Sequence, residues 1–411
     1  MPTSLPPEPQ EPPSSAGKSS LRVIAQSDGL GIYNAVVPCG QDGFIAVGMN
    51  ALGGKDETEA VIDQYNADFQ LVKTVRLGKG IAGNTIVSKD GGYLVRMFGN
   101  ADSQILYLDK NFNRVWSIKP PPEGEKQPLF QYITQLKNGD IFATYSCGTE
   151  PSDLKLAFYD KNGKLKTQAK LFDCNYNSAV KIVEDGNGGV YLLGTHNADG
   201  LLLDKTIAGA CNYGGCDVFV ARLNARYEVV SAKAYGGSGN DALETAEMDK
   251  DGNLYLAMNT SSTDRDLEGC GANPDEPSLR VLLKISPDGK VLWKNVLCRQ
   301  GFKMEQIGGI VLVGDRIVVN GSAPYQDGVL SRFPCPGRGD LSDVNFTAYI
   351  TKDGNTENIR MFPIDMDNAG FSILPLPGDK FVVAGALFRN GYALGLPFNA
   401  DERTKALHIL E

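Results

Sequence analysis

The stretch YGGSGNDALETAEMDKDGNLYLA, residues 235–257, decides the fold. A glycine-rich turn at 236–239 leads into one strand, and an Asp-Gly turn at 251–252 leads into a second strand at 253–258. Apolar residues alternate or run in short groups on both sides of the turn, as paired strands require. The stretch is the clearest copy of a unit that recurs along the chain.

The turn and the strand after it occur seven times. The copies are QDGFIAVG (41–48), KDGGYLVR (89–96), KNGDIFAT (137–144), GNGGVYLLG (186–194), KDGNLYLA (250–257), VGDRIVVNG (313–321) and PGDKFVVAG (377–385). Their turn glycines, Gly43 to Gly378, are spaced by 48, 48, 49, 64, 62 and 64 residues, and glycine suits the positive φ of a tight hairpin. A second turn follows each of the first six copies, so each unit holds four strands. This period predicts an all-β, seven-bladed β-propeller with four-stranded antiparallel blades.

The ends of the chain predict how the ring closes. The last unit has only three strands, near 371–376, 381–386 and 405–410, while the segment LRVIAQS (21–27) precedes the first unit. We expect 21–27 to pair beside 405–410 as the missing fourth strand, which leaves no open sheet edge. The propeller domain is therefore 21–411.

The composition and charge of the chain exclude some classes of binding partner. The 411 residues carry a formal charge of −9, which argues against a nucleic-acid partner. The sequence has no apolar run long enough for a transmembrane segment and no signal-peptide pattern. Residues 1–20 (MPTSLPPEPQEPPSSAGKSS) are rich in proline and serine and predict a disordered tether. This tether could carry a lipid anchor or make an assembly contact.

The opening stretch resembles the bacterial SBBP-type β-propeller repeats of secreted and surface lipoproteins. Their pattern is W-x-K-x-(Y/F)-GGS-x-x-D, an apolar strand, and then D-x-DGG-x-Y-(L/I)-x-G-x-T. Residues 233–241, 249–253, 255–256 and Thr260 match it, and SPDGKVLWKNV (286–296) matches the strand that precedes it. The other blades keep only the turn and strand. The resemblance implies a propeller fold and an extracellular, cell-surface or periplasmic location, and it implies no catalytic residue.

Four insertions break the repeat, at 195–216, 259–278, 322–343 and 386–403. They fall between second and third strands, so we expect them on one face, over blades four to seven. Long loops on a rigid scaffold commonly bind ligands, although inert surface loops are the alternative. Aromatic and arginine side chains suit a saccharide or protein surface. The candidate ligand-binding residues are Tyr213, Asp264, Arg265, Asp266, Tyr325, Arg332, Arg338 and Tyr392.

Eight cysteines fit the same picture. Cys147 and Cys174 lie 27 residues apart in blade three, and Cys270 and Cys298 repeat that placement 28 residues apart in blade five. We expect these two pairs to form disulfides, along with a local bridge between the cysteines of CNYGGC, Cys211 and Cys216, all of which requires an oxidising compartment. Spacing cannot prove the connectivity, and reduced thiols in a cytoplasmic protein are the alternative.

Catalytic and cofactor signals are weak. The two histidines are His196, expected in an insertion, and His408, expected in the last strand. No cofactor is expected, although the alternating carboxylates of TDRDLEG (263–269) could hold Ca²⁺. The sequence thus favours a non-enzymatic binding propeller for a protein or glycan, engaged through the loops of blades four to seven. The alternatives are a structural subunit that uses its N-terminal arm and a propeller lyase or hydrolase.

Overall fold

The structure is a computed structural model of the whole chain. It describes residues 21–41, 43–52, 57–99, 102–122, 128–147, 154–170, 177–185, 188–197, 213–270, 279–298, 307–324, 330–333, 343–362, 372–387 and 404–410. The expected tether, 1–20, lies outside these residues.

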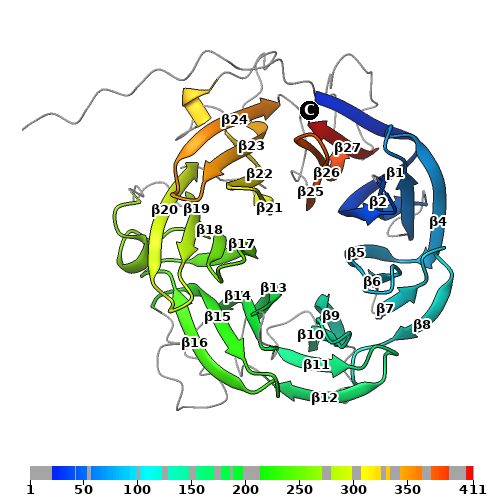
Figure 1. The fold of residues 1–411 in the computed structure, drawn as a ribbon, viewed down its shortest axis with the longest axis horizontal. Helices are drawn as coiled ribbons and strands as arrows, with labels where there is room; N and C mark the ends of the chain where they lie inside the picture. Colours follow the sequence, from blue (N-terminus) through cyan, green and yellow to red (C-terminus); the bar gives the residue numbers. More distant parts are fainter. Residues whose placement is uncertain are drawn as a thin grey trace, which may run out of the picture.

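Seven antiparallel blades surround a central axis, as predicted (Figure 1). Blade one contains β1 (Leu21–Cys39), β2 (Gly43–Ala51), β3 (Thr58–Tyr65) and β4 (Leu71–Lys79). Blade two contains β5 (Ile81–Val87), β6 (Tyr93–Gly99), β7 (Asp102–Leu108) and β8 (Arg114–Ile118). Blade three contains β9 (Pro128–Gln135), β10 (Ile141–Cys147), β11 (Lys155–Tyr159) and β12 (Leu165–Lys170). Blades four and five contain β13 (Asn177–Glu184), β14 (Val190–Asn197), β15 (Cys216–Leu223), β16 (Val229–Tyr235); and β17 (Asp241–Met248), β18 (Leu254–Thr260), β19 (Leu279–Ile285), β20 (Val291–Cys298). Blades six and seven contain β21 (Ile307–Val313), β22 (Arg316–Pro324), β23 (Asp343–Thr351), β24 (Thr356–Phe362); and β25 (Ser372–Leu376), β26 (Lys380–Leu387), β27 (Thr404–Leu410). Two short 3₁₀ helices, η1 (Arg265–Leu267) and η2 (Leu330–Arg332), lie between the second and third strands of blades five and six.

The strand β1 belongs to two blades. Its first residues pair antiparallel with β27, with Leu21 opposite Leu410 and Ala25 opposite Ala406. Its later residues pair with β2, with Cys39 opposite Gly43. Blades seven and one therefore form one continuous seven-stranded sheet.

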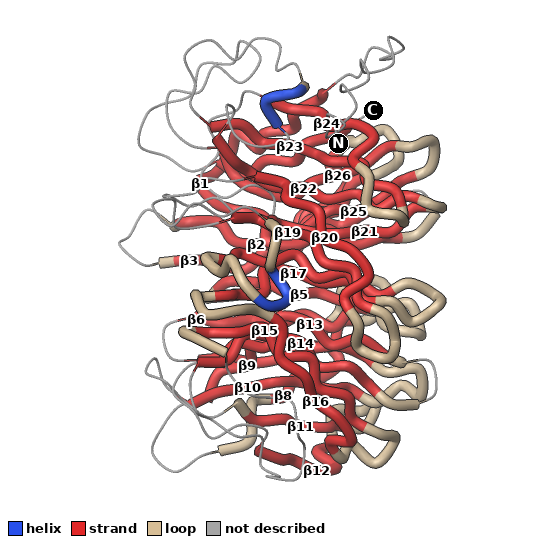
Figure 2. The backbone as a smooth tube through the Cα atoms, turned by 90° about the vertical axis from the view of Figure 1, so that its left-hand side faces the viewer, coloured by secondary structure: helices blue, strands red, loops and turns tan. Residues whose placement is uncertain are grey.

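The hairpin turns that join first to second strands use left-handed glycines. Gly91, Gly139, Gly188, Gly252, Gly314 and Gly378 all have positive φ, between 58° and 89°. Blade one differs from the prediction, because Gly40 has the positive φ of 64° there and Gly43 starts β2. A Cβ atom on Gly43 would lie 2.8 Å from the carbonyl oxygens of Cys39 and Tyr65, so this glycine permits close strand approach instead. Figure 2 shows the short turns gathered at one face of the ring.

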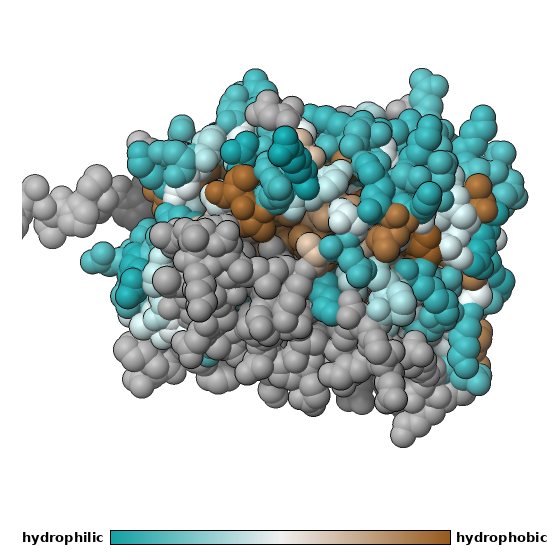
Figure 3. Space-filling model, turned by 90° about the horizontal axis from the view of Figure 1, so that it is seen from below, coloured by the Kyte–Doolittle hydropathy of each residue, from teal (hydrophilic) through white to brown (hydrophobic). Residues whose placement is uncertain are grey.

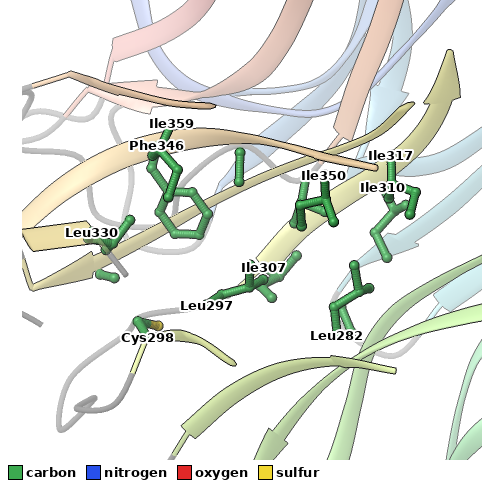
Figure 4. Close-up of a cluster of buried hydrophobic side chains, with 14 of the residues drawn as sticks. Leu282, Leu297, Cys298, Ile307, Ile310, Ile317, Leu330, Phe346, Ile350 and Ile359 are labelled. Atoms are coloured by element: carbon green, nitrogen blue, oxygen red, sulfur yellow. The ribbon is translucent and has the colours of Figure 1, made fainter. Parts of the chain in front are cut away.

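Apolar clusters hold neighbouring blades together. Figure 4 shows the cluster between blades five and six, where Leu282 and Leu297 meet Ile307 and Phe346. Further out, Trp293 of β20 donates its indole N–H to the Lys352 oxygen at 2.9 Å and covers the turn at Gly354. Blades two and three meet in the same way, where the ring of Trp116 lies against Gly163. Outer strands thus dock onto the outer turn of the next blade.

The outer rim is mixed in polarity. Figure 3 shows apolar groups among hydrophilic ones on one side of the ring. Large apolar side chains are exposed on the outermost strands of blades one to five, for example Val72 at 59% and Val115 at 57%. Among the described residues, no helix is long and apolar enough to cross a membrane.

Removing the closing strand should destabilise the ring. A chain that begins at Gly31 loses the backbone pairs that join Leu21–Ala25 to β27 and exposes that strand edge. At about 1 kcal/mol for each net hydrogen bond, we expect a loss of roughly 3–7 kcal/mol in the free energy of unfolding. The measurement is chemical denaturation, with a chain that begins at Leu21 as the control. Equal stability of the two chains would show that the pairing does not hold the ring.

Candidate functional site: the propeller axis and the blade four–five junction

The four insertions join second and third strands, as predicted, because they fall between β14 and β15, β18 and β19, β22 and β23, and β26 and β27. Tyr213, Asp264, Arg265, Asp266 and Arg332 lie among the described residues, and Arg332 ends η2 on blade six with an exposed side chain. Tyr325, Arg338 and Tyr392 lie outside the described residues.

Four of the candidate residues lie together at the junction of blades four and five. The Arg265 guanidinium lies over the Tyr213 ring, 4.4 Å from its centroid. Asp264 accepts the Ser238 N–H at 2.8 Å, and Asp266 accepts the Gly236 N–H at 3.4 Å. These two carboxylates therefore hold the glycine-rich connector between β16 and β17 in place, and the Arg265 side chain is exposed.

Two further carboxylates, Asp217 and Asp241, lie fully buried beneath this connector. A Cβ atom on Gly236 would lie 2.0 Å from Asp217 Oδ1 and 2.5 Å from Asp241 Oδ2, so only glycine fits between them. Burial, together with the nearby charges of Asp241 and Asp266, raises the pKa of Asp217 to about 6, although the N–H groups of Tyr213 and Gly214 act to lower it. Asp241 accepts the Gly237 N–H at 2.8 Å and the Ser262 hydroxyl at 2.7 Å.

No group of three or more His, Cys, Asp or Glu in the described ranges is arranged to hold a metal ion. The carboxylates Asp264 and Asp266 bind backbone N–H groups instead, so Ca²⁺ stays a prediction without support from this geometry. His196 is not in a loop as expected: it lies in β14, is 1% exposed and meets Phe219 edge-on. Burial lowers the pKa of His196 to about 4.

The disulfides stay predictions. Cys270 and Cys298 are both described and buried, in blade five. Cys174 and Cys211 lie outside the described residues, so the pairs with Cys147 and Cys216 are not defined.

The inner strands carry a feature that the repeat did not predict. In blades one to six the innermost strand has a register irregularity, which leaves residues such as Asn34, Asn84 and Glu244 out of the ladder. Bulges of this kind redirect side chains. Asn34 donates to the Ala82 oxygen at 2.9 Å, and Asn84 accepts the Ile133 N–H at 2.8 Å. Glu244 accepts the Ile307 N–H at 3.0 Å, so each of these side chains reaches the next blade.

The same strands enclose a cavity of about 530 Å³ at the axis. All seven blades contribute to its wall. Polar and charged lining groups outnumber large apolar ones and come from Asn34, Asn84, Thr85, Arg96, Tyr132, Lys181, Glu244, Thr245, Glu247 and Ser372. The sequence did not predict this site, because its lining residues come from seven blades and meet only in the closed ring.

Ion pairs balance most of the charge at the axis. Lys181 pairs with Glu247 at 3.1 Å, and Arg280, behind the wall, pairs with Glu244 at 3.3 Å. Burial acts to lower the pKa of Lys181, but Tyr132 and Glu247 outweigh it and hold that pKa above its ordinary value. Burial raises the pKa of Glu244 against the opposing effect of Arg280.

Comparisons with known proteins define the fold. No family model matches the sequence, and no curated protein matches it. Among solved structures, a catalytically inactive virginiamycin B lyase from Staphylococcus aureus, with quinupristin, has 13% identity and a TM-score of 0.54, over 95% of this chain and 99% of that one. An ulvan lyase bound to -[GlcA(1-4)Rha3S]- has 12% identity and a TM-score of 0.55, over 94% and 95%. A puromycin hydrolase has 14% identity and a TM-score of 0.52, over 90% of this chain and 52% of that one.

The chain shares the propeller fold of these proteins. At such identities the likeness shows the fold alone, and the neighbours include enzymes with different substrates.

Breaking the buried pair at the axis should cost more stability than breaking an exposed one. Glu244→Ala leaves Arg280, whose side chain is 6% exposed, without its carboxylate. We expect a loss of roughly 3–5 kcal/mol in the free energy of unfolding. Glu357→Ala, which breaks the exposed pair with Arg316, should cost under about 1 kcal/mol. Equal losses in chemical denaturation would contradict the burial argument.

Asp217 should make stability depend on pH. Its pKa in the folded protein is above the ordinary 3.8, so its contribution to stability is complete below that pH and is lost as the pH rises through about 6. Asp217→Asn mimics the neutral acid and should gain roughly 1–3 kcal/mol relative to wild type between about pH 4 and about pH 7.

Asp264→Asn is the matched control. The Ser238 N–H lowers the pKa of Asp264, so the contribution of Asp264 to stability should increase with pH, whereas that of Asp217 decreases. Parallel pH profiles of wild type and Asp217→Asn in chemical denaturation would refute the assignment.

Proposed function

We propose that the protein is an extracytoplasmic binding propeller that takes a segment of an extended polar ligand, a glycan or a protein loop, into its axial cavity. The observation that carries this proposal is the cavity of about 530 Å³, lined by hydrogen-bonding side chains from six of the seven blades. Concave sites with a few convergent polar groups are the usual form of ligand sites. We call the face opposite the short turns, where second strands connect to third strands, the loop face. The insertions in these connections and the Tyr213–Arg265 pair would add contacts around the entrance of the axial cavity.

A second cavity supports an extended ligand. It measures about 270 Å³, and Thr58, Lys79, Asp102 and Gln104 contribute polar groups to it. Phe98 lines both cavities and lies one residue before the end of β6, near the face that carries the loops between second and third strands. Gly80 also lines this cavity, and a Cβ atom on it would lie 3.0 Å from the Phe98 oxygen, so glycine allows the two strands to approach closely there. A chain of several units could therefore occupy both.

The proposed location rests on the sequence. The repeat at 235–257 resembles secreted and surface SBBP-type propellers, and we propose membership of that group. The expected disulfides would fit an oxidising compartment. A glycan ligand is consistent with the ulvan lyase, a propeller of similar fold that holds an acidic disaccharide.

A lyase or hydrolase is the second candidate. Tyr132 lies close enough to Lys181 to affect the pKa of its amine, and both line the same cavity as Arg96. A phenol beside cations can exchange a proton with a bound substrate. Unsaturated products that absorb ultraviolet light, formed from acidic polysaccharides, would favour this reading.

Filling the axial cavity should weaken binding. Ligands found on a glycan array or in a peptide library are measured by calorimetry against wild type and Thr245→Trp, because Thr245 lines the cavity. We expect at least a tenfold weaker affinity, about 1.4 kcal/mol. The matched control is Thr167→Trp on the exposed face of β12. Binding that survives Thr245→Trp would place the ligand elsewhere.

A further inference from the structure

Arg96 reaches the axial cavity from β6, the second strand of blade two. The inner strand in front of it is β5, where Gly83 and Asn84 fall out of the ladder. A Cβ atom on Gly83 would lie 3.0 Å from both Arg96 Nη2 and the Phe98 ring. The absence of a side chain at Gly83 therefore leaves the space that the guanidinium occupies.

The Arg96 guanidinium is held in place, yet within the described part of the chain most of its donors have no acceptor. Nη1 donates to the Phe130 oxygen at 2.9 Å, and the group lies over the Phe98 ring at 4.5 Å. Nε is buried and has no hydrogen-bond partner among the described residues. An arginine has five N–H donors, so this one keeps capacity for a ligand.

Arg96 also differs from the other cations at the axis. Lys181 and Arg280 pair with Glu247 and Glu244, whereas no carboxylate in the described part of the chain pairs with Arg96. Burial lowers the pKa of Arg96 to about 10, which leaves it charged at neutral pH. A buried charge without a counter-ion is costly, and an anion that enters the cavity would offset that cost.

We propose that Arg96 is the specificity-determining residue of the axial cavity and binds an oxyanion, a carboxylate or a sulfate ester, on the ligand. This inference rests on the proposed function, because it assumes that the cavity receives a ligand. The planar guanidinium suits two-oxygen contacts with such groups. The ligand class is therefore an acidic glycan, and its carboxylate or sulfate ester is the group that Arg96 recognises.

The test uses small probes on the full chain. Glucuronate, inorganic sulfate and neutral glucose are titrated at constant ionic strength into wild type, Arg96→Gln and Arg76→Gln, and binding is measured by calorimetry and thermal shift. Arg76 is the matched control because its side chain is 61% exposed and pairs with Glu59. We expect Arg96→Gln to weaken anion affinity by about 10- to 100-fold. Glucose should bind equally, if at all, to all three proteins.

The two anions distinguish the source. Binding of glucuronate alone indicates a carboxylate ligand, binding of sulfate alone indicates a sulfate ester, and either result supports the inference. A second readout needs no variant: the Nε–H resonance of Arg96 in wild type should shift on addition of the anion that binds. An Arg96→Lys variant keeps the charge and should retain part of the affinity.

Anion binding that is unchanged in Arg96→Gln, or absent from wild type, would overturn the inference. The proposed function would survive either result if a larger ligand still bound wild type and lost affinity in Thr245→Trp. It would fail separately if that variant bound every ligand as wild type does.

Discussion

The pairing of β1 with β27 is the interaction on which the ring depends. Each blade buries its faces only against its two neighbours, so the seventh blade must meet the first for either to be covered. One strand does this by belonging to both blades, with Leu21 opposite Leu410 and Cys39 opposite Gly43. Deeper in the seam, the Val36 N–H donates to the Ser372 hydroxyl at 3.3 Å. Closure also fixes how far apart the inner strands lie, and therefore the width of the cavity at the propeller axis.

The bulged inner strands connect this closure to the cavity. A regular strand would turn alternate side chains to its two faces, whereas a bulge adds a residue that can face the axis or the next blade. Asn34, Asn84 and Glu244 use that freedom to bind the neighbouring inner strand. Gly83 uses it to make room for Arg96. The same irregularity thus stabilises the ring and lines the cavity with polar groups.

The sequence predicted the fold well because its signals are local. Every Asp-Gly or equivalent turn marked a hairpin, and the expected bounds of the last three strands were correct to within one residue. The expected strand at 21–27 is instead the first part of the longer β1. The one turn that differed, at Gly40, lies where Gly43 has a packing requirement that sequence spacing cannot separate from a φ requirement. Long-range features were harder to predict. Asp264 and Asp266 looked like ligand-binding carboxylates, but their partners are backbone N–H groups nearly thirty residues away.

The axial cavity could not be predicted for a related reason. Arg96, Lys181 and Glu247 come from three blades, and only the closed ring brings them together. The sequence does not show the bulges, so it cannot tell a polar side chain of an inner strand that faces the cavity from one at an ordinary polar position. His196 shows the opposite error, since an insertion was expected to begin one residue before it and β14 instead continues through it.

The position of Leu21 sets how the molecule would sit on a surface. Leu410 lies opposite both Leu21 and Phe381, and Phe381 is the second residue after the turn at 377–379. The first described residue therefore lies at the face of the short turns, away from the loops that join second and third strands. Attachment through the residues before it would point the loop face outward on every copy. An array of such copies would offer a polymer many equivalent sites at once, so weak single contacts could sum to strong avidity.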